Sequence, residues 1–183
     1  MLPISVPELT QEFLKSRLEY RDGCFYWRVK PVIDSGDRRW NTKYSGKRAG
    51  SLDLSSGYRY IGFTIKGKRQ HFLEHRLVFI WFHGHFPKGQ IDHEKGIKDQ
   101  NWIEYLRDVS SSENNKNKRM PKNNTSGVMG VSWHKPLGKW RAGIMVDYKT
   151  IHLGYFYDKF EAICARKSSE VKYRFHENHG RKL

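Results

Sequence analysis

Asp92 and His93 are neighbours in the segment IDHEKGIKDQNWIEYLRDVSSSENNKN (91–117), which also contains Asn114. A neutral imidazole near pH 7 can accept a proton from water. One carboxylate and one amide oxygen, with water in the other positions, can hold Mg²⁺ or Mn²⁺ against a phosphate. These three side chains could therefore hydrolyse a phosphodiester. An ordinary polar loop has a similar composition, so other parts of the chain must decide.

The net charge indicates a polyanionic partner. The 183 residues include 34 Lys and Arg against 19 Asp and Glu, a formal charge of +15. Each neutralised phosphate releases condensed counterions, so a surplus this large favours nucleic acid. The alternative is a surface that is simply well hydrated and highly charged. RNA is a weaker candidate than DNA because no aromatic stacking motif of the RRM kind is present.

Several protein classes are excluded. Cys24 and Cys164 lie far apart in apolar surroundings with no CxxC pair, so neither a zinc ribbon nor a disulfide framework is expected. The start, MLPISVPELTQEF, lacks the features of a signal peptide. The longest apolar run, LVFIWF at 77–82, is too short to span a bilayer. We expect a cytoplasmic protein without membrane or small-molecule partners, and a monomer, because no segment is typical of a dimerisation helix.

Apolar periodicity predicts the elements before the Asp-His pair. A helical stripe of Leu9, Phe13, Leu14 and Leu18 runs through 7–20, with Pro7 in the first turn. The other predicted elements are a strand at 24–29, loops around short strands at 31–57, a hairpin at 58–75 turning at Lys66-Gly67, and a short helix at 75–84 closed by Gly84.

After the pair, IEYLRDV (103–109) predicts a short strand, and Ser110 with Glu113 predicts a capping box. This box places Asn114 in the first turn of a helix. The next stretch is basic, and Pro121 ends any helix there, which marks a domain boundary. It is either a solvated linker or a segment that follows a phosphate backbone, through Lys116, Lys118, Arg119 and Lys122.

Beyond this boundary, three short strands at 130–135, 139–146 and 150–156 precede a helix at 159–175. Trp140, Ala142, Ile144 and Val146 alternate on one sheet face, which the helix should cover. We expect the helix to use Phe160, Ile163, Cys164, Val171 and Phe175 for this purpose. The uncovered face would then carry Ser132, His134, Arg141, Met145, Thr150 and His152, ringed by Lys135, Lys139 and Lys149.

The segment 75–118, from HRL through PKGQIDHEKGIKDQNWIEYLRDVSSSENNKN, resembles the HNH endonucleases of mobile elements. The resemblance implies a ββα-metal fold, His93 as general base, Asp92 and Asn114 as metal ligands, and Arg76 as a phosphate contact. Relatives usually have Asn where this chain has Tyr105. That Asn mainly ties down the loop, so Asn101 is expected to share the loop-bracing role with Tyr105.

Residues 126–180, with the order GVSWHK, GKWRA and IHLGYF, are similar to the plant apetala-two (ethylene-response) DNA-binding domain, also found behind phage HNH nucleases. The resemblance implies a sheet that lies in the DNA major groove. Positions that are usually Arg or Trp are Ser132, Met145, Thr150 and His152 here. Arg141 is the arginine that remains, so contacts to phosphates are expected to dominate over base reading.

The sequence therefore predicts an α+β, phage-type homing endonuclease that acts on double-stranded DNA in the cytoplasm of a bacterial host. The alternative is an inactive HNH scaffold that binds DNA and regulates. The predicted parts are a β-rich N-terminal region (1–74), a nuclease core (75–118), a basic linker (119–125) and a three-stranded antiparallel sheet packed on one helix (126–183).

Overall fold

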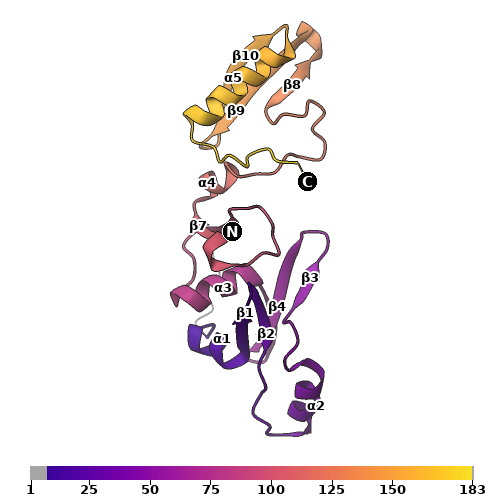
Figure 1. The fold of residues 1–183 in the computed structure, drawn as a ribbon, viewed down its shortest axis with the longest axis vertical. Helices are drawn as coiled ribbons and strands as arrows, with labels where there is room; N and C mark the ends of the chain where they lie inside the picture. Colours follow the sequence, from indigo (N-terminus) through magenta and orange to yellow (C-terminus); the bar gives the residue numbers. More distant parts are fainter. Residues whose placement is uncertain (1–7, 183) are drawn as a thin grey trace. The chain divides into compact units, whose positions relative to one another are not determined.

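The computed structural model describes residues 8–182. Within them the chain is α+β, with five α-helices and four small sheets (Figure 1). It forms two compact units, Met1–Asp108 and Val109–Leu183. Each unit is described by itself below. The finer division into four parts stays a prediction, and Pro7 lies outside the described residues.

The first unit opens with helix α1 (Gln11–Arg17), which Thr10 caps by accepting a hydrogen bond from the Phe13 amide. The helix is shorter than expected, because Leu18 already begins strand β1 (Leu18–Arg21). β1 pairs with β2 (Cys24–Trp27) across Asp22-Gly23. Both turn residues have positive φ, as a tight hairpin turn requires. The apolar stripe was correctly identified, since Leu9, Leu14 and Leu18 are buried.

The prediction of loops and short strands at 31–57 is wrong for its first half. Helix α2 (Ser35–Tyr44) occupies it, capped by Asp34, whose side chain accepts from the Asp37 amide. None of its residues is buried. An apolar stripe is the main signal for a helix in a sequence, and a helix that buries nothing has no such stripe.

The remaining part of the first unit carries its largest sheet and its core. Strands β3 (Ser51–Asp53), β4 (Tyr58–Ile65) and β5 (Lys68–Leu73) form an antiparallel sheet, with the expected turn at Lys66-Gly67. Helix α3 (Glu74–His83) follows and ends at Gly84, whose left-handed conformation confirms the predicted cap. The core gathers apolar side chains from these elements, among them Phe25, Ile61, Leu77 and Ile80.

Strand β6 (Gln90–His93) pairs with β7 (Leu106–Val109). The predicted strand at 103–109 is only half correct, because Ile103–Tyr105 form a 3₁₀ turn (η1) before the strand begins. Helix α4 (Ser111–Asn115) belongs to the second unit. The predicted capping box is confirmed, since Ser110 and Glu113 exchange hydrogen bonds with each other's backbone amides.

The second unit contains strands β8 (Val131–His134), β9 (Lys139–Val146) and β10 (Lys149–Phe156), with a 3₁₀ turn (η2, Lys135–Leu137) between the first two. Helix α5 (Lys159–Lys172) packs on the face that carries the buried Ala142.

The expected apolar face of α5 is wrong in part. Phe160 and Val171 are 72% and 80% exposed, and Cys164 is exposed, not in apolar surroundings. Ala162, Arg166 and Glu170 are the buried residues. Arg166 donates to Glu170 and to the Gly143 carbonyl, at 2.9 and 2.8 Å, and a hydrophobicity pattern cannot identify a charged pair as core.

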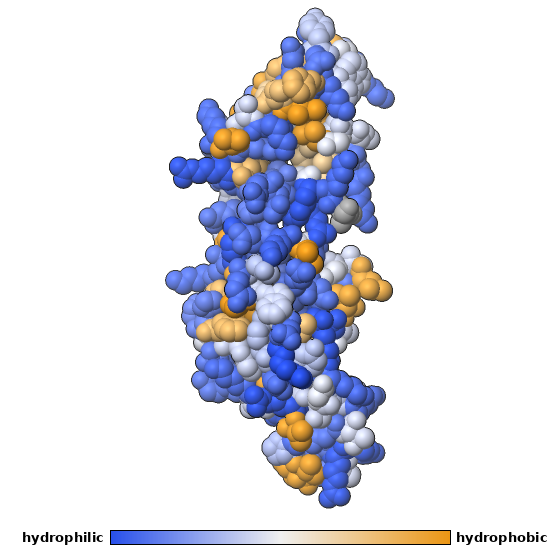
Figure 2. Space-filling view, in the orientation of Figure 1, coloured by the Kyte–Doolittle hydropathy of each residue, from blue (hydrophilic) through white to orange (hydrophobic). Residues whose placement is uncertain are grey.

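The surface is largely hydrophilic, and the face in Figure 2 shows hydrophobic residues only in small separate patches. Within residues 8–182, no helix has the length and apolar character needed to cross a membrane.

Gly50 offers a stability test of the junction between β2 and β4. Its φ is +75°, and an added Cβ would meet the backbone oxygen of Tyr60. Gly67 has the same φ of +75° but open space around it. Gly67→Ala should therefore cost only the left-handed penalty, about 1 kcal/mol, whereas Gly50→Ala should cost about 1–3 kcal/mol more. Urea unfolding of the two variants measures this difference, and equal losses would contradict the close approach.

Candidate functional site

Asp92 and His93 end strand β6, and both are buried, with 6% and 5% of their surface exposed. Polar side chains buried this deeply need partners. Their partners come from the loop that follows β6, from α3 and from β7.

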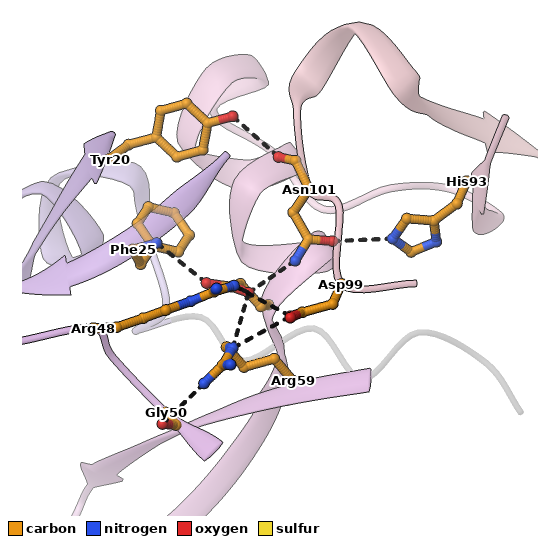
Figure 3. Close-up of polar contacts among 9 residues, drawn as sticks. Tyr20, Phe25, Arg48, Gly50, Arg59, His93, Asp99 and Asn101 are labelled. Carbon is orange, nitrogen blue, oxygen red and sulfur yellow. Dashed lines mark hydrogen bonds and ion pairs between the residues drawn. The ribbon is translucent and has the colours of Figure 1, made fainter. Parts of the chain in front are cut away.

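The His93 ring is held by Asn101. Its Nε2 lies 3.0 Å from the Asn101 Oδ1, and the Asn101 Nδ2 donates to the Glu74 Oε2 at 2.8 Å (Figure 3). A carboxylate only accepts hydrogen bonds, so Glu74 fixes which end of the amide faces it. The amide oxygen must then face His93, and Nε2 must be the donor. In the neutral ring the proton therefore sits on Nε2 and the basic lone pair on Nδ1.

Glu74 has no exposed surface and collects donors from several segments. It accepts from the Phe25 amide at 3.1 Å and pairs with Arg48 at 3.3 Å and Arg59 at 3.8 Å. Burial raises the pKa of this carboxyl, while the Phe25 amide and the arginines oppose the rise. Asp99 lies on the same two arginines, at 3.2 and 3.3 Å.

Arg76 is the phosphate contact that the resemblance implies, and it follows His75 on α3. The side chain is half-buried on α3, and burial lowers its pKa against the opposing charge of Asp108.

A cluster of rings surrounds the other side of the imidazole. The His75 ring meets the His93 ring edge-on at 5.0 Å, and Tyr58 lies 5.2 Å from His75 and 6.0 Å from His93. Burial places the pKa of His75 well below its usual value, and His93 and Arg76 lower it further. His75 is therefore neutral at physiological pH.

Asp92 is paired with Arg107, whose guanidinium lies 2.6 Å from Oδ2. Arg107 also approaches Glu94, at 3.9 Å. No site role was predicted from the sequence for Arg107, His75 or Glu74. Of these three, only Glu74 could have been noticed in the sequence, because it is an acidic residue just before the strongly apolar segment 77–82.

The predicted metal ligands are placed as follows. Asp92 offers the carboxylate, and Asn114 is half-buried on α4 in the second unit, so its pairing with Asp92 stays a prediction. Over the described range 8–182, no group of three or more His, Cys, Asp or Glu is placed to hold a metal. The predicted site has only one residue of these four types, Asp92, together with the amide of Asn114, so this finding does not test it. A cation at Asp92 would have to displace or share Arg107.

The two residues expected to brace the loop are in different surroundings. Asn101 is 1% exposed, and its backbone oxygen also accepts from the Tyr20 hydroxyl at 3.0 Å. Tyr105 is half-buried in η1, with Lys95 Nζ 3.6 Å from its ring centre, and its backbone oxygen accepts from the Glu94 amide at 2.9 Å.

In the second unit, Ser132, Arg141, Met145, Thr150 and His152 are exposed on the sheet. They line a cleft of about 750 Å³ together with residues of segment 115–125. His134 differs from the prediction, because it is half-buried with its ring 5.0 Å from Tyr155.

The predicted basic residues around this sheet differ in exposure. Lys135 and Lys149 are exposed, whereas Lys139 is half-buried with its Nζ 4.1 Å from the Tyr157 ring. Lys118 and Lys122 are exposed, and Lys116 and Arg119 are half-buried.

The basic segment is tied into this unit by its backbone. The Lys116 and Lys118 carbonyls accept from the amides of His176 and Gly180, and the Met120 amide donates to the Arg181 carbonyl. The segment thus runs beside the C-terminal residues.

Comparison with known proteins gives one partial relative. Protein 3.8 of Escherichia phage T7 is 36% identical over 77 residues, which are 40% of this chain and 64% of the relative. The chain thus spans less than two thirds of that protein's length. No family model matches the chain. No solved structure matches it either.

The neutral state of His75 predicts a pH dependence of stability. The unfolded chain protonates this histidine near its ordinary pKa of 6.5, and the folded chain does not. Below that pH the unfolded state binds the extra proton, so the free energy of unfolding falls as pH falls. The loss is at most about 1.4 kcal/mol per pH unit for one group.

His75→Phe keeps a ring but cannot bind the proton, so its stability should fall less steeply between about pH 7 and pH 5. Urea unfolding across this range measures both slopes. The comparison with wild type matters because burial also lowers the pKa of His179, to about 4, which adds a slope of the same sign. An unchanged slope in His75→Phe would contradict a neutral, buried His75.

Proposed function

We propose that this chain is a metal-dependent DNA endonuclease of the HNH type, in which His93 is the general base. The hydrogen-bonded series Glu74–Asn101–His93 is the observation that carries the proposal. It places the proton on Nε2, which makes Nδ1 the atom that takes a proton from the attacking water. The series holds the ring in one tautomer and one orientation, as a general base requires.

Asp92 is the carboxylate that would hold a Mg²⁺ or Mn²⁺ ion, and Asn114 is the amide ligand that the sequence predicts. When bound, such an ion polarises the phosphate and stabilises the leaving oxygen. The chain's own contribution is to orient the base, to keep His75 neutral beside it, and to supply Arg107 as a cation close to Asp92.

The second unit supports DNA as the substrate in this proposal. Its sheet exposes Arg141 among small and polar side chains, and basic residues lie around it. Lysines attract phosphates of any sequence, whereas an arginine can bond guanine O6 and N7 together. This unit would supply affinity and modest site preference to a nuclease whose general base lies in the first unit.

The second candidate is a DNA-binding protein without catalysis. The contact between Arg107 and Asp92, at 2.6 Å, favours it, because the guanidinium lies where a cation would bind. Tyr105 in place of the family's Asn points the same way.

Nicking of supercoiled plasmid separates the two functions. Wild type should nick with Mg²⁺ and not with EDTA, and His93→Ala should lose roughly a hundredfold or more in rate, the contribution of a general base. His85→Ala is the matched control, because His85 is exposed, and it should keep full activity. DNA binding in EDTA should be equal in all three proteins. Absence of nicking by wild type with either Mg²⁺ or Mn²⁺ would overturn the nuclease.

The role of Asn101 needs a readout beyond activity. Asn101→Leu removes the acceptor for Nε2–H, so we expect both tautomers of His93 in ¹⁵N NMR spectra of histidine-labelled protein. The nicking rate should fall about tenfold or more.

Tyr20→Phe is the control for this experiment, because it removes a hydrogen bond to the Asn101 backbone and leaves the amide side chain alone. This variant should keep the Nε2–H tautomer even where its stability drops. A single, unchanged tautomer in Asn101→Leu would refute the orienting role.

A further inference from the structure

A second cleft in the first unit, of about 790 Å³, takes no part in the proposed chemistry. One wall is helix α2 with the end of β2, and the opposite wall is one face of the sheet β3–β4–β5. This sheet wall is formed by Tyr60, Gly62, Phe63 and Thr64 of β4 and by Arg69 and His71 of β5. The neighbouring residues Ile61 and Ile65 point into the core. The cleft is thus a built feature of the sheet.

The charge of this cleft has one sign. Its lining includes six Lys or Arg residues and one His, and no Asp or Glu. Of these, Arg48 is paired with Glu74 and Asp99 and so is already neutralised. The other five, Arg17, Lys30, Lys43, Lys47 and Arg69, therefore give the cleft its positive potential. Such a lining suits a ligand with several negative charges.

The cleft is also aromatic. Trp40 lies 5.4 Å from Trp27 and 5.4 Å from Tyr44, and Trp27 lies 5.8 Å from Phe63. Lys30 Nζ is 4.2 Å from the Trp40 ring centre, and Lys43 Nζ is 5.2 Å from that of Tyr44. Rings and cations therefore lie next to one another along this wall. An apolar protein partner would not need the cations of the cleft, and a free phosphate ion would not need its rings.

Gly62 completes the arrangement on the sheet side. A Cβ at this position would lie 2.7 Å from His71 and 2.8 Å from Arg69, so both side chains lie directly over the glycine. The absence of a side chain keeps the floor of the cleft low and lets the basic side chains of β5 lie across it.

We propose that this cleft binds an unpaired stretch of nucleic acid, with bases against Trp40 and Tyr44 and phosphates on Lys30, Lys43, Lys47 and Arg69. An unpaired base presents both of its faces to aromatic side chains, whereas in a duplex the neighbouring base pairs cover them. A duplex can therefore use only the cations of the cleft. The inference needs no catalysis at His93 and stands apart from the proposed nuclease.

The test measures binding of fluorescent oligothymidylate of about twelve nucleotides to the full chain in EDTA, where no metal-dependent cleavage occurs. Trp40→Leu should weaken binding by roughly five- to a hundredfold, the range for loss of stacking on one aromatic side chain. Trp102→Leu is the matched control, a 38% exposed tryptophan of the same unit outside the cleft, and should bind as wild type does. Thermal melting verifies that both variants fold.

The phosphate contacts have their own pair of variants. Lys43→Gln should reduce the slope of log affinity against log salt by roughly 0.7, the value for one phosphate of a single strand. Lys68→Gln, on β5 next to Arg69 but outside the lining, should leave the slope unchanged. An oligomer of abasic sites should bind Trp40→Leu and wild type equally. Oligouridylate in place of oligothymidylate distinguishes RNA from DNA as the source of the strand.

Photocrosslinking locates the strand when the second unit also binds it. Oligothymidylate with 5-iodouracil should form adducts within residues 27–44, found by peptide mapping. Adducts only in 109–183, wild-type affinity in a folded Trp40→Leu, or an equal loss on a duplex would each overturn the inference. Binding without any nicking in the plasmid assay would uphold the cleft and remove the nuclease.

Discussion

The charge of Glu74, buried without any exposed surface, is the constraint on which the first unit depends. An ionised carboxylate inside a protein is tolerated only where donors and opposite charges compensate for the lost water. Those donors come from β2, from the segment before β3, from β4 and from the loop after β6, through Phe25, Arg48, Arg59 and Asn101. Segments that are far apart in the chain must therefore meet at the two carboxylate oxygens of Glu74. One of these donors, Asn101, also sets the orientation of His93.

This arrangement explains which features could be read from the sequence. The β4–β5 hairpin, the end of α3 at Gly84 and the capping box of Ser110 with Glu113 depend on local backbone chemistry, and each was predicted. Asp92 and His93 were also predicted together, because they are adjacent in the chain. The buried ion pairs were not, since the partners of Glu74 are 15 to 49 residues away in the chain and no periodicity links them.

The same limit appears in the second unit. Ala142 and Ile144 follow the alternation of a half-buried strand, were expected on the covered face and are buried. Helix α5 buries Arg166 and Glu170 in place of Phe160 and Val171, because Arg166 bonds the Gly143 carbonyl and lies 3.1 Å from His179. A hydrophobicity scale always assigns charged residues to the solvent-exposed face of a helix. Where a charged residue forms hydrogen bonds with buried backbone and side-chain groups, this assignment predicts the wrong buried face.

Helix α2 has a consequence for the dynamics of the first unit. It buries no residue, and the Asn41 side chain anchors it through paired hydrogen bonds with the Lys30 backbone, at 2.8 and 2.9 Å. Opening of such an element exposes little apolar surface, so its free energy of local unfolding is far below that of the core. The helix can therefore exchange its amide hydrogens and admit proteases while the Glu74 junction stays closed. Any ligand that rests on Trp40 would slow both processes in α2 alone, without moving the global unfolding transition of the core.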